Sequence, residues 1–392
     1  MGHLTAAAAR PPTLGLVILC ITETVSWGLL YYSLPTAAQP ISAATGWSQS
    51  VITTGFSAGL LVSAAGGIWA GRLLDRYGPG KTMTVGSVIG VVGLIIVAIA
   101  PNLIVFVMAW LVVGLAQSLV LYQAAFAAIT HWYQEQRVRP LTLVTVAGGL
   151  ASTIFAPLVA FLVTELGWRP AYLVIAAVLG VVTVPLHVLL LRVPWHSYGA
   201  GPAAVDRDHV RRVTRSARFI VLQLALGTAT LGIMAVTINL VPLLIDRGAG
   251  YAVAAVGLGL LGAGQVAGRI GYALIPRRQP PGMRFMIIIG TSAITLLALA
   301  VVPGPIWLLI VIGVVAGMAR GCQTLVQANA VSDRWGTAGF GTINGIFAAP
   351  LTAAGALAPA VGAGLGGVLG FPVMAAVMAG LVAVAAVAGA RT

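Results

Sequence analysis

Residues 71–81 read GRLLDRYGPGK, a short turn with four charged side chains between two long apolar stretches. Charge is scarce elsewhere, because only 7% of the residues are Asp, Glu, Lys or Arg, whereas 59% are hydrophobic. The mean hydropathy of the chain is +1.02, a value that excludes a soluble domain. The turn therefore joins two segments that can each cross a bilayer.

Apolar runs of this kind recur along the whole chain. A run of about 20 residues spans the roughly 30 Å hydrocarbon layer as a helix. We predict an all-α integral membrane fold with twelve transmembrane helices, at 14–38, 49–70, 83–100, 102–130, 140–164, 170–191, 218–245, 251–275, 285–302, 305–331, 339–367 and 371–390. The two cysteines, Cys20 and Cys322, fall inside predicted spans, so no disulfide framework is expected.

The net charge of +13 would favour a nucleic-acid partner in a soluble protein. Its distribution here indicates membrane topology instead. If the N-terminus is inside and loops alternate, all but two of the twenty-one Lys and Arg residues lie on the inner side or in a helix leading to it; the exceptions are Arg169 and Arg247. This positive-inside bias predicts a multi-pass protein of the cell membrane with both termini in the cytoplasm and no nucleic-acid partner.

The chain divides near its middle. Residues 193–217 are rich in Pro, Gly and charge, which indicates a cytoplasmic linker between an N-terminal half, 1–192, and a C-terminal half, 218–392. A weak internal repeat supports this division, since a shift of 203 residues aligns Gly114 and Trp132 with Gly317 and Trp335. We therefore predict two pseudo-symmetric halves of six helices each.

The turn at 71–81 resembles the signature loop of the major facilitator superfamily, which joins the second and third membrane helices on the cytoplasmic side. The family pattern is Gly-x-x-x-Asp-Arg/Lys-x-Gly followed by basic residues, although Pro79-Gly80 delays the basic residue here. The resemblance implies a substrate site near the midplane between the two halves. It also implies a conformational latch, which closes the inner side and is formed by Gly71, Asp75, Arg76, Gly78 and Lys81.

A second stretch narrows the resemblance. Residues 132–141 read WYQEQRVRPL and continue into the small residues of 147–152, which is similar to a motif of the monocarboxylate and oxalate/formate porters. Glu23 and Trp27-Gly28 resemble the first-helix motif of that group with a different spacing, so the substrate does not carry over. Ala156-Pro157 stands where drug antiporters have Gly-Pro, which disfavours a drug exporter.

Two charged residues lie in the middle of predicted spans. Glu23 is the only one of the eight carboxylates at mid-depth, and Arg320 is taken as the only intramembrane cation. A charge at the bilayer centre costs about 3 kcal/mol on insertion scales, so both side chains are expected to face a cavity or a partner. Arg320 is predicted to anchor an anionic substrate, because guanidinium groups bind carboxylates in a bidentate manner. The alternative is a structural ion pair.

Polar side chains form stripes on the same helices, which line the central cavity in the resembled superfamily. Arg320, Gln323 and Gln327 recur at helical spacing on the tenth span, and Glu23, Trp27 and Tyr31 do so on the first. Interhelical hydrogen bonds, worth about 0.6 kcal/mol each, are the other explanation. The predicted substrate-binding residues are Arg320, Gln323, Gln327, Trp27, Tyr31, Gln117, Tyr122 and Gln123.

Glu23 has two compatible roles. A carboxyl group in a cavity of low dielectric can bind and release a proton as the cavity changes face, which would couple transport to protons. Alternatively, Glu23 is a counter-ion of Arg320 that yields when a substrate anion binds the arginine.

The expected function is secondary transport of a small organic solute, such as a monocarboxylate anion, by alternating access with proton coupling. A proton-driven exporter of toxic compounds is the alternative within transport, and a non-transporting membrane sensor is the alternative of another class. No Ser-His-Asp, paired-carboxylate or metal-ligand pattern is present, so neither an enzyme nor a metal nor a cofactor is expected. The expected partners are the substrate, protons and lipid, and the fold requires no oligomer.

Overall fold

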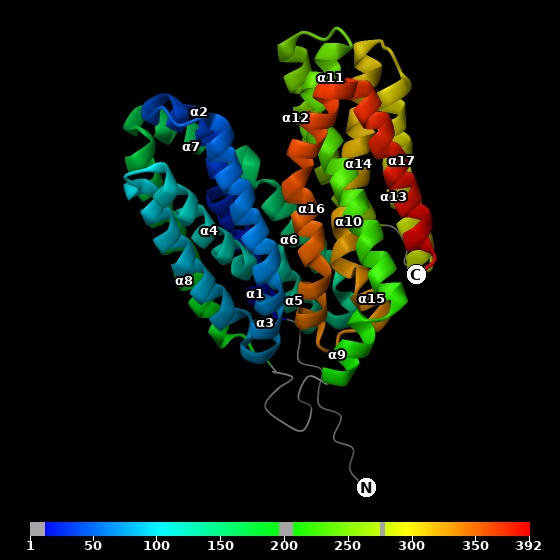
Figure 1. Ribbon diagram of the computed structural model, residues 1–392. Coiled ribbons are helices and arrows are strands. Elements are labelled where there is room, and N and C mark those ends of the chain that lie inside the picture. Colours follow the sequence, from blue (N-terminus) through cyan, green and yellow to red (C-terminus); the bar gives the residue numbers. More distant parts are fainter. Residues whose placement is uncertain (1–11, 196–206, 275–278) are drawn as a thin grey trace.

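The computed structural model describes residues 12–195, 207–274 and 279–392, and the regular structure in these ranges is helical (Figure 1). Residues 196–206 of the predicted linker lie outside the described ranges. The helices form two bundles arranged as a V in Figure 1. They meet towards the end that carries α9 and α15, and they diverge towards the end that carries α2 and α11.

The first bundle holds the helices of the first six predicted spans. These are α1 (Thr13–Ser26), the π-helix η1 (Trp27–Tyr32), α2 (Ser33–Thr45), α3 (Gln49–Ile99), α4 (Leu103–Val120), α5 (Tyr122–Tyr133), α6 (Val138–Gly149), α7 (Ala151–Leu166) and α8 (Trp168–Leu189). Short 3-10 turns lie at Gln134–Gln136 and Leu190–Arg192.

The second bundle follows the short helix α9 (Arg207–Thr214). It contains α10 (Ala217–Ile238), α11 (Leu240–Asp246), α12 (Tyr251–Leu274), α13 (Pro281–Val301), α14 (Ile306–Ala330), α15 (Ser332–Trp335), α16 (Phe340–Leu369) and α17 (Phe371–Ala390).

The twelve predicted spans match the helices in order: 14–38 covers α1, η1 and the start of α2, and 49–70 and 83–100 both lie in α3. Each of the other spans is one helix or two consecutive helices. Ten helical segments of the described chain are long and apolar enough to cross a membrane. One of them, Ser50–Ile99, contains two predicted spans joined at Gly78, and α12 adds a 24-residue helix outside those ten. The predicted all-α membrane fold is confirmed.

The turn at 71–81 is a sharp reversal inside α3. Gly78 has φ 78° and ψ 171°, a left-handed conformation that glycine adopts without strain. A side chain there would also collide with the indole of Trp195, since its Cβ would lie 2.7 Å from the ring. Pro79 then begins the second of the two helical segments of α3, a position where its missing N–H removes no hydrogen bond.

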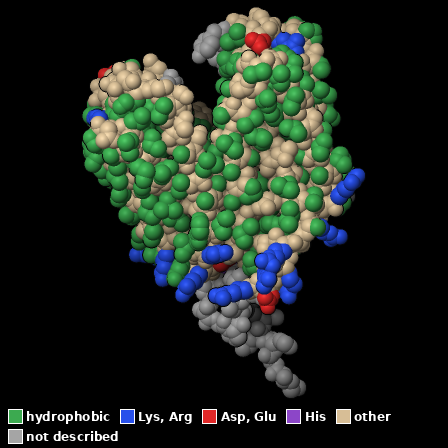
Figure 2. All heavy atoms as spheres, viewed as in Figure 1, with side chains coloured by type: hydrophobic (Ala, Val, Ile, Leu, Met, Phe, Trp, Pro, Cys, Tyr) green, Lys and Arg blue, Asp and Glu red, His purple; other side chains and the backbone are tan. Residues whose placement is uncertain are grey.

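The outer surface of both bundles is apolar. Hydrophobic side chains cover the sides in Figure 2, and individual residues such as Ile104 and Val181 are each 75% exposed. Lys and Arg gather instead at the end where the bundles meet, which we call the basic face (Figure 2). An apolar belt with a charged end suits a protein surrounded by lipid.

Small residues let the helices approach closely. The glycines of the Gly264-x-x-x-Gly268 motif in α12 lie against the backbone of α14, and a Cβ at Gly264 would collide with the carbonyl oxygen of Val314. Close backbone approach is the main way in which helices associate in lipid, where apolar burial contributes little.

We therefore expect Gly264→Ala to destabilise the fold by about 1–3 kcal/mol, the usual cost of overpacking. Gly262→Ala in the same helix is the matched control, because no atom lies within 4 Å of a Cβ placed there. Thermal unfolding of the two purified variants in detergent measures the difference. Equal melting temperatures would show that the α12–α14 contact is not tight.

Candidate functional site

A cavity of about 260 Å³ lies between the two bundles, halfway along their helices. Figure 2 shows a hollow between the bundles at the end opposite the basic face. All eight residues predicted to bind substrate line this cavity: Arg320, Gln323, Gln327, Trp27, Tyr31, Gln117, Tyr122 and Gln123. The structure thus brings them together, and their binding roles stay predictions.

The first bundle contributes an aromatic wall. The ring of Trp27 lies 4.9 Å from that of Tyr31 and 4.8 Å from that of Tyr122, measured between centroids. Tyr122 in turn stacks on Phe126, with centroids 5.2 Å apart and planes inclined by 9°. Such rings offer a flat apolar surface for the carbon skeleton of a ligand.

Interrupted helices shape this wall. Trp27 begins the π-helical turn η1, and Tyr122 follows a break at Leu121, where ψ is −172°. The side-chain amide of Gln117 donates a hydrogen bond of 2.8 Å to the carbonyl oxygen of Leu30 inside the π turn. Helix breaks near mid-depth are a recurrent feature of substrate sites in transporters, and π turns recur at functional sites.

The second bundle contributes a polar wall with a positive charge. Gln323 donates a hydrogen bond of 3.1 Å to the hydroxyl of Thr230, so α14 and α10 hold each other in place. Arg320 lies beside these residues, and its guanidinium makes no hydrogen bond or ion pair to another described side chain. Its donors are therefore available to a ligand.

Arg269 is a second cation of the cavity, so the prediction that Arg320 is the only intramembrane cation is wrong. Arg269 is 8% exposed and lies close enough to Arg320 for the two charges to interact. The position of Arg269 inside the predicted span 251–275 could have identified it as an intramembrane cation. A shift of 197 residues aligns Arg269 with Arg72 of the charged turn, and this similarity hid its place in the cavity.

Arg269 also bridges the two bundles. Its Nη1 donates a hydrogen bond of 2.6 Å to the carbonyl oxygen of Thr145 in α6, and its Nε is buried with no partner in the described ranges. Gly149 makes room for this contact, because a Cβ there would collide with Nη1 of Arg269. The same carbonyl accepts a bond of 3.1 Å from the Tyr122 hydroxyl. No Asp or Glu occurs among the described residues that line the cavity.

Glu23 lies behind the aromatic wall rather than on the cavity. Its side chain is completely buried, and its Oε2 accepts a hydrogen bond of 3.0 Å from the indole N–H of Trp27. Its Oε1 has no hydrogen-bond partner in the part of the chain that the structure describes. Among the described residues it makes no ion pair with Arg320, so the counter-ion alternative has no contact to support it.

Asp75 connects the bundles at the basic face. It accepts hydrogen bonds from the backbone N–H of Gly341 at 2.9 Å and from both the N–H (2.6 Å) and the hydroxyl (2.7 Å) of Thr342. These donors form the first turn of α16, where the helix dipole favours a negative charge. Gly71 lies against the backbone of Gly341, whereas Arg76 and Lys81 are exposed.

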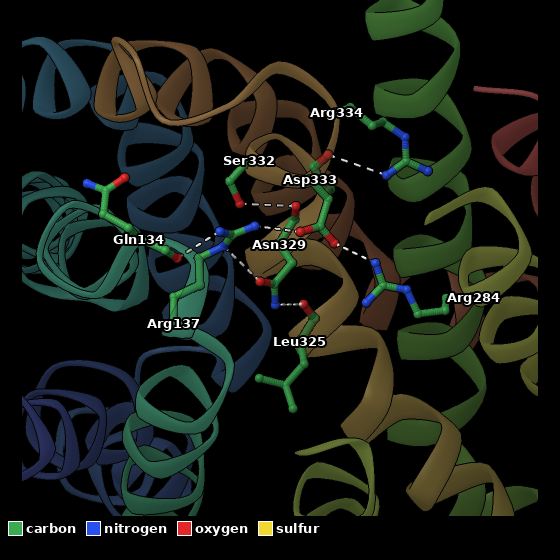
Figure 3. Close-up of polar contacts among 9 residues, drawn as sticks. Gln134, Arg137, Arg284, Leu325, Asn329, Ser332, Asp333 and Arg334 are labelled. Atoms are coloured by element: carbon green, nitrogen blue, oxygen red, sulfur yellow. Dashed lines mark hydrogen bonds and ion pairs between the residues drawn. The ribbon is translucent and has the colours of Figure 1, made fainter. Parts of the chain in front are cut away.

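A second, largely buried charge cluster also joins the two bundles and was missed by the sequence analysis. Figure 3 shows Arg137 of the first bundle and Arg284 of the second approaching Asp333 from opposite sides. Nη2 of Arg137 is 2.5 Å from Oδ1 of Asp333, and Nη2 of Arg284 is 2.9 Å from Oδ2. Arg137 also donates to the Asn329 side chain at 3.2 Å and to the Gln134 carbonyl at 2.8 Å.

Comparison with known proteins identifies the family. Residues 16–305 match the model of the Major Facilitator Superfamily. The chain belongs to the major facilitator superfamily. The match confirms the resemblance that the charged turn at 71–81 indicated.

Several curated relatives share part of the chain. An uncharacterised 38 kDa protein of Thermoproteus tenax is 31% identical over 58% of this chain and 56% of its own length. Mouse monocarboxylate transporter 11 is 26% identical over 62% and 55%, and bovine monocarboxylate transporter 13 is 24% identical over 83% and 77%. The match thus spans about half of the first two relatives.

Solved structures show the same superfamily fold over almost the whole chain. The transporter FucP in its outward conformation aligns with a TM-score of 0.77 at 15% identity, covering 96% of this chain and 97% of its own. The human organic anion transporter MFSD10 aligns with a TM-score of 0.75 at 14% identity, covering 96% and 99%. The family match and the named relatives, taken together, point to a transporter and not to an enzyme.

The contacts of Asp75 generate a test of the latch. We expect Asp75→Asn to raise the fraction of molecules open at the basic face about tenfold, equivalent to about 1.4 kcal/mol. This is just below the value of one hydrogen bond to a charged group, about 1.5–3 kcal/mol. Substrate affinity should change little, because Asp75 does not line the cavity.

The opening is measured as the distance between spin labels on α3 and α16 by pulsed electron resonance. Glu135→Gln is the matched control, since Glu135 is an exposed carboxylate near the same face. A large loss of equilibrium substrate binding in Asp75→Asn with an unchanged distance distribution would contradict the latch.

Proposed function

We propose that this member of the superfamily is a secondary transporter of a small organic anion, such as a monocarboxylate. The observation that carries the proposal is the pairing of Arg320 with Arg269 in a cavity whose described lining contains no carboxylate. Two neighbouring positive charges at mid-membrane depth repel each other and are costly to desolvate. A bound carboxylate offsets both costs and accepts paired hydrogen bonds from a guanidinium.

The opposite wall supports an organic rather than an inorganic anion. Trp27, Tyr31 and Tyr122 line the same cavity as the arginines, and their rings pack into one aromatic cluster. A volume of about 260 Å³ suits a compact carbon skeleton. The names of the relatives, monocarboxylate transporters and an organic anion transporter, agree with this chemistry.

Movement of the substrate would follow from alternating access of two halves, 1–192 and 218–392, joined by the linker 193–217. The contacts of Asp75 and Asp333 close the basic face, and the hollow at the other end leaves the opposite side open (Figure 2). We assign the basic face and both termini to the cytoplasm of a cell membrane by the positive-inside rule. The described conformation is then open to the outside.

Proton coupling is assigned to Glu23. Its hydrogen bond to Trp27 links the carboxyl to a ring that lines the cavity, so a change in its protonation alters a contact of the substrate wall. Export of cationic drugs is disfavoured by the two cavity arginines. A sensor on the same fold would bind the anion without moving it.

Binding and movement are tested in sequence. A thermal-shift screen of the purified protein against small organic acids identifies ligands, and uptake of the labelled ligand into proteoliposomes measures transport. Stabilisation by acids followed by saturable uptake supports the proposal. Binding without uptake would favour the sensor over the transporter. Stabilisation by organic cations alone would contradict the proposal that the substrate is an anion.

Arg320 provides the first mutational prediction. Arg320→Lys keeps the charge but loses the planar fork, so substrate affinity should fall at least about tenfold, the loss of one charge-assisted hydrogen bond. In Arg320→Gln the substrate affinity should fall further, because the charge is lost as well. Arg211→Gln, which removes an exposed charge from α9, is the control. Normal binding by both Arg320 variants, measured by calorimetry with the acid found in the screen, would refute the anchor.

Glu23 provides the second. Glu23→Gln fixes the side chain in a form that resembles the protonated acid, so substrate exchange across the membrane should persist while accumulation driven by a pH gradient is lost. Counterflow and pH-driven uptake are measured in the same proteoliposomes, with Glu165→Gln as the exposed control. A Glu23→Gln protein that still concentrates substrate would mean that protons enter elsewhere.

A further inference from the structure

A second hollow, of about 660 Å³, lies at the basic face on the second bundle. It is separate from the central cavity and shares none of its lining residues. The start of α10, the start of α13, α15 and the end of α17 enclose it, and it contains Arg218, Met283, Met286, Arg334, Trp335 and Arg391. We call it the α13–α17 groove.

Positive charge in the groove exceeds the negative charge available to it. The carboxylate side chain among its described lining residues, Asp333, already accepts contacts from Arg137 on one oxygen and from Arg284 on the other. Arg218 and Arg391 are exposed on either side. The groove therefore presents an excess of positive charge.

Arg334 also lacks acceptors for its guanidinium nitrogens. Its Nη1 has one long hydrogen bond of 3.4 Å to the carbonyl oxygen of Ala330, and its Nε and Nη2 are buried without partners among the described residues. Leaving charged donors unsatisfied in a buried place is costly, and paired acceptor oxygens relieve that cost. Nε and Nη2 form the edge of a guanidinium that matches two oxygens of a phosphate.

The place of the groove in the fold selects a lipid as the source of that phosphate. α13 begins at Pro281 and α17 ends at Ala390, so the groove lies where two spanning helices leave the hydrocarbon. Met283 is 52% exposed at its edge, and Ile287 and Val387 continue an apolar surface along the two helices. Trp335, half-buried in the groove, is a residue type enriched at this depth.

We propose that the α13–α17 groove binds the phosphate headgroup of an anionic phospholipid. Arg334 and the flanking Arg218 and Arg391 hold the phosphate, and the acyl chains lie along α13 and α17. Arg334 follows Asp333 in the four-residue helix α15. A lipid bound to Arg334 therefore also holds Asp333 in place, and Asp333 pairs with Arg137 of the other bundle. Lipid binding thereby favours closure of the basic face.

The test uses the full chain in nanodiscs of phosphatidylcholine with increasing fractions of phosphatidylglycerol. The thermal transition of the wild-type protein should rise with the phosphatidylglycerol fraction. Each arginine removed should weaken the apparent lipid affinity about fivefold, the effect of one basic side chain at an anionic surface. Arg334→Gln and the double variant Arg218→Gln/Arg391→Gln are compared with Arg211→Gln, an exposed arginine of α9 outside the groove.

Two further arms separate the possible sources of phosphate. Inorganic phosphate, added to the detergent-solubilised protein, should not reproduce the stabilisation. If it does so at concentrations comparable to the lipid, the groove binds a free anion and the lipid assignment is overturned. An equal response in Arg211→Gln and in the double variant would also overturn it, and that double variant leaves α15 intact should Arg334→Gln prove unstable.

Discussion

Positive charge held at mid-depth between two helical bundles is the constraint on which this structure depends. Within the described residues, Arg320 has no side-chain partner, and the one acceptor of Arg269 is a backbone carbonyl. Each is tolerable only because the helices around it are interrupted, polar or built from small residues. Gly149 shows this directly, since any side chain there would displace Arg269 from the carbonyl of Thr145.

Arg269 has a further consequence, because its hydrogen bond crosses between the bundles. A carboxylate that binds in the cavity competes with the Thr145 carbonyl for the same guanidinium. Occupancy of the cavity would then change a contact between the halves, which is what a substrate must do to shift a conformational equilibrium. In the proposed mechanism, the contacts of Asp75 and Asp333 at the basic face would hold the described state until that happens.

Local sequence patterns predicted much of this arrangement. The twelve spans follow from apolar length, and the cavity residues follow from polar stripes at helical spacing, such as Arg320, Gln323 and Gln327. The burial of Glu23 behind Trp27 was not predicted. The π turn that begins at Trp27 changes the helical register, so residues before and after the turn no longer share one face. The Arg137–Asp333 pair was missed for another reason: its partners are 196 residues apart and meet only through packing of the two bundles.

A comparison of one carboxylate with its amide tests the central claim most directly. The amide has nearly the same shape and lacks only the negative charge, so the two ligands differ in what the paired arginines recognise. With the best acid from the screen, calorimetry on the wild-type protein should show binding of the carboxylate and at least about tenfold weaker binding of the amide. Equal affinities for the two would contradict a cavity built around an uncompensated positive charge.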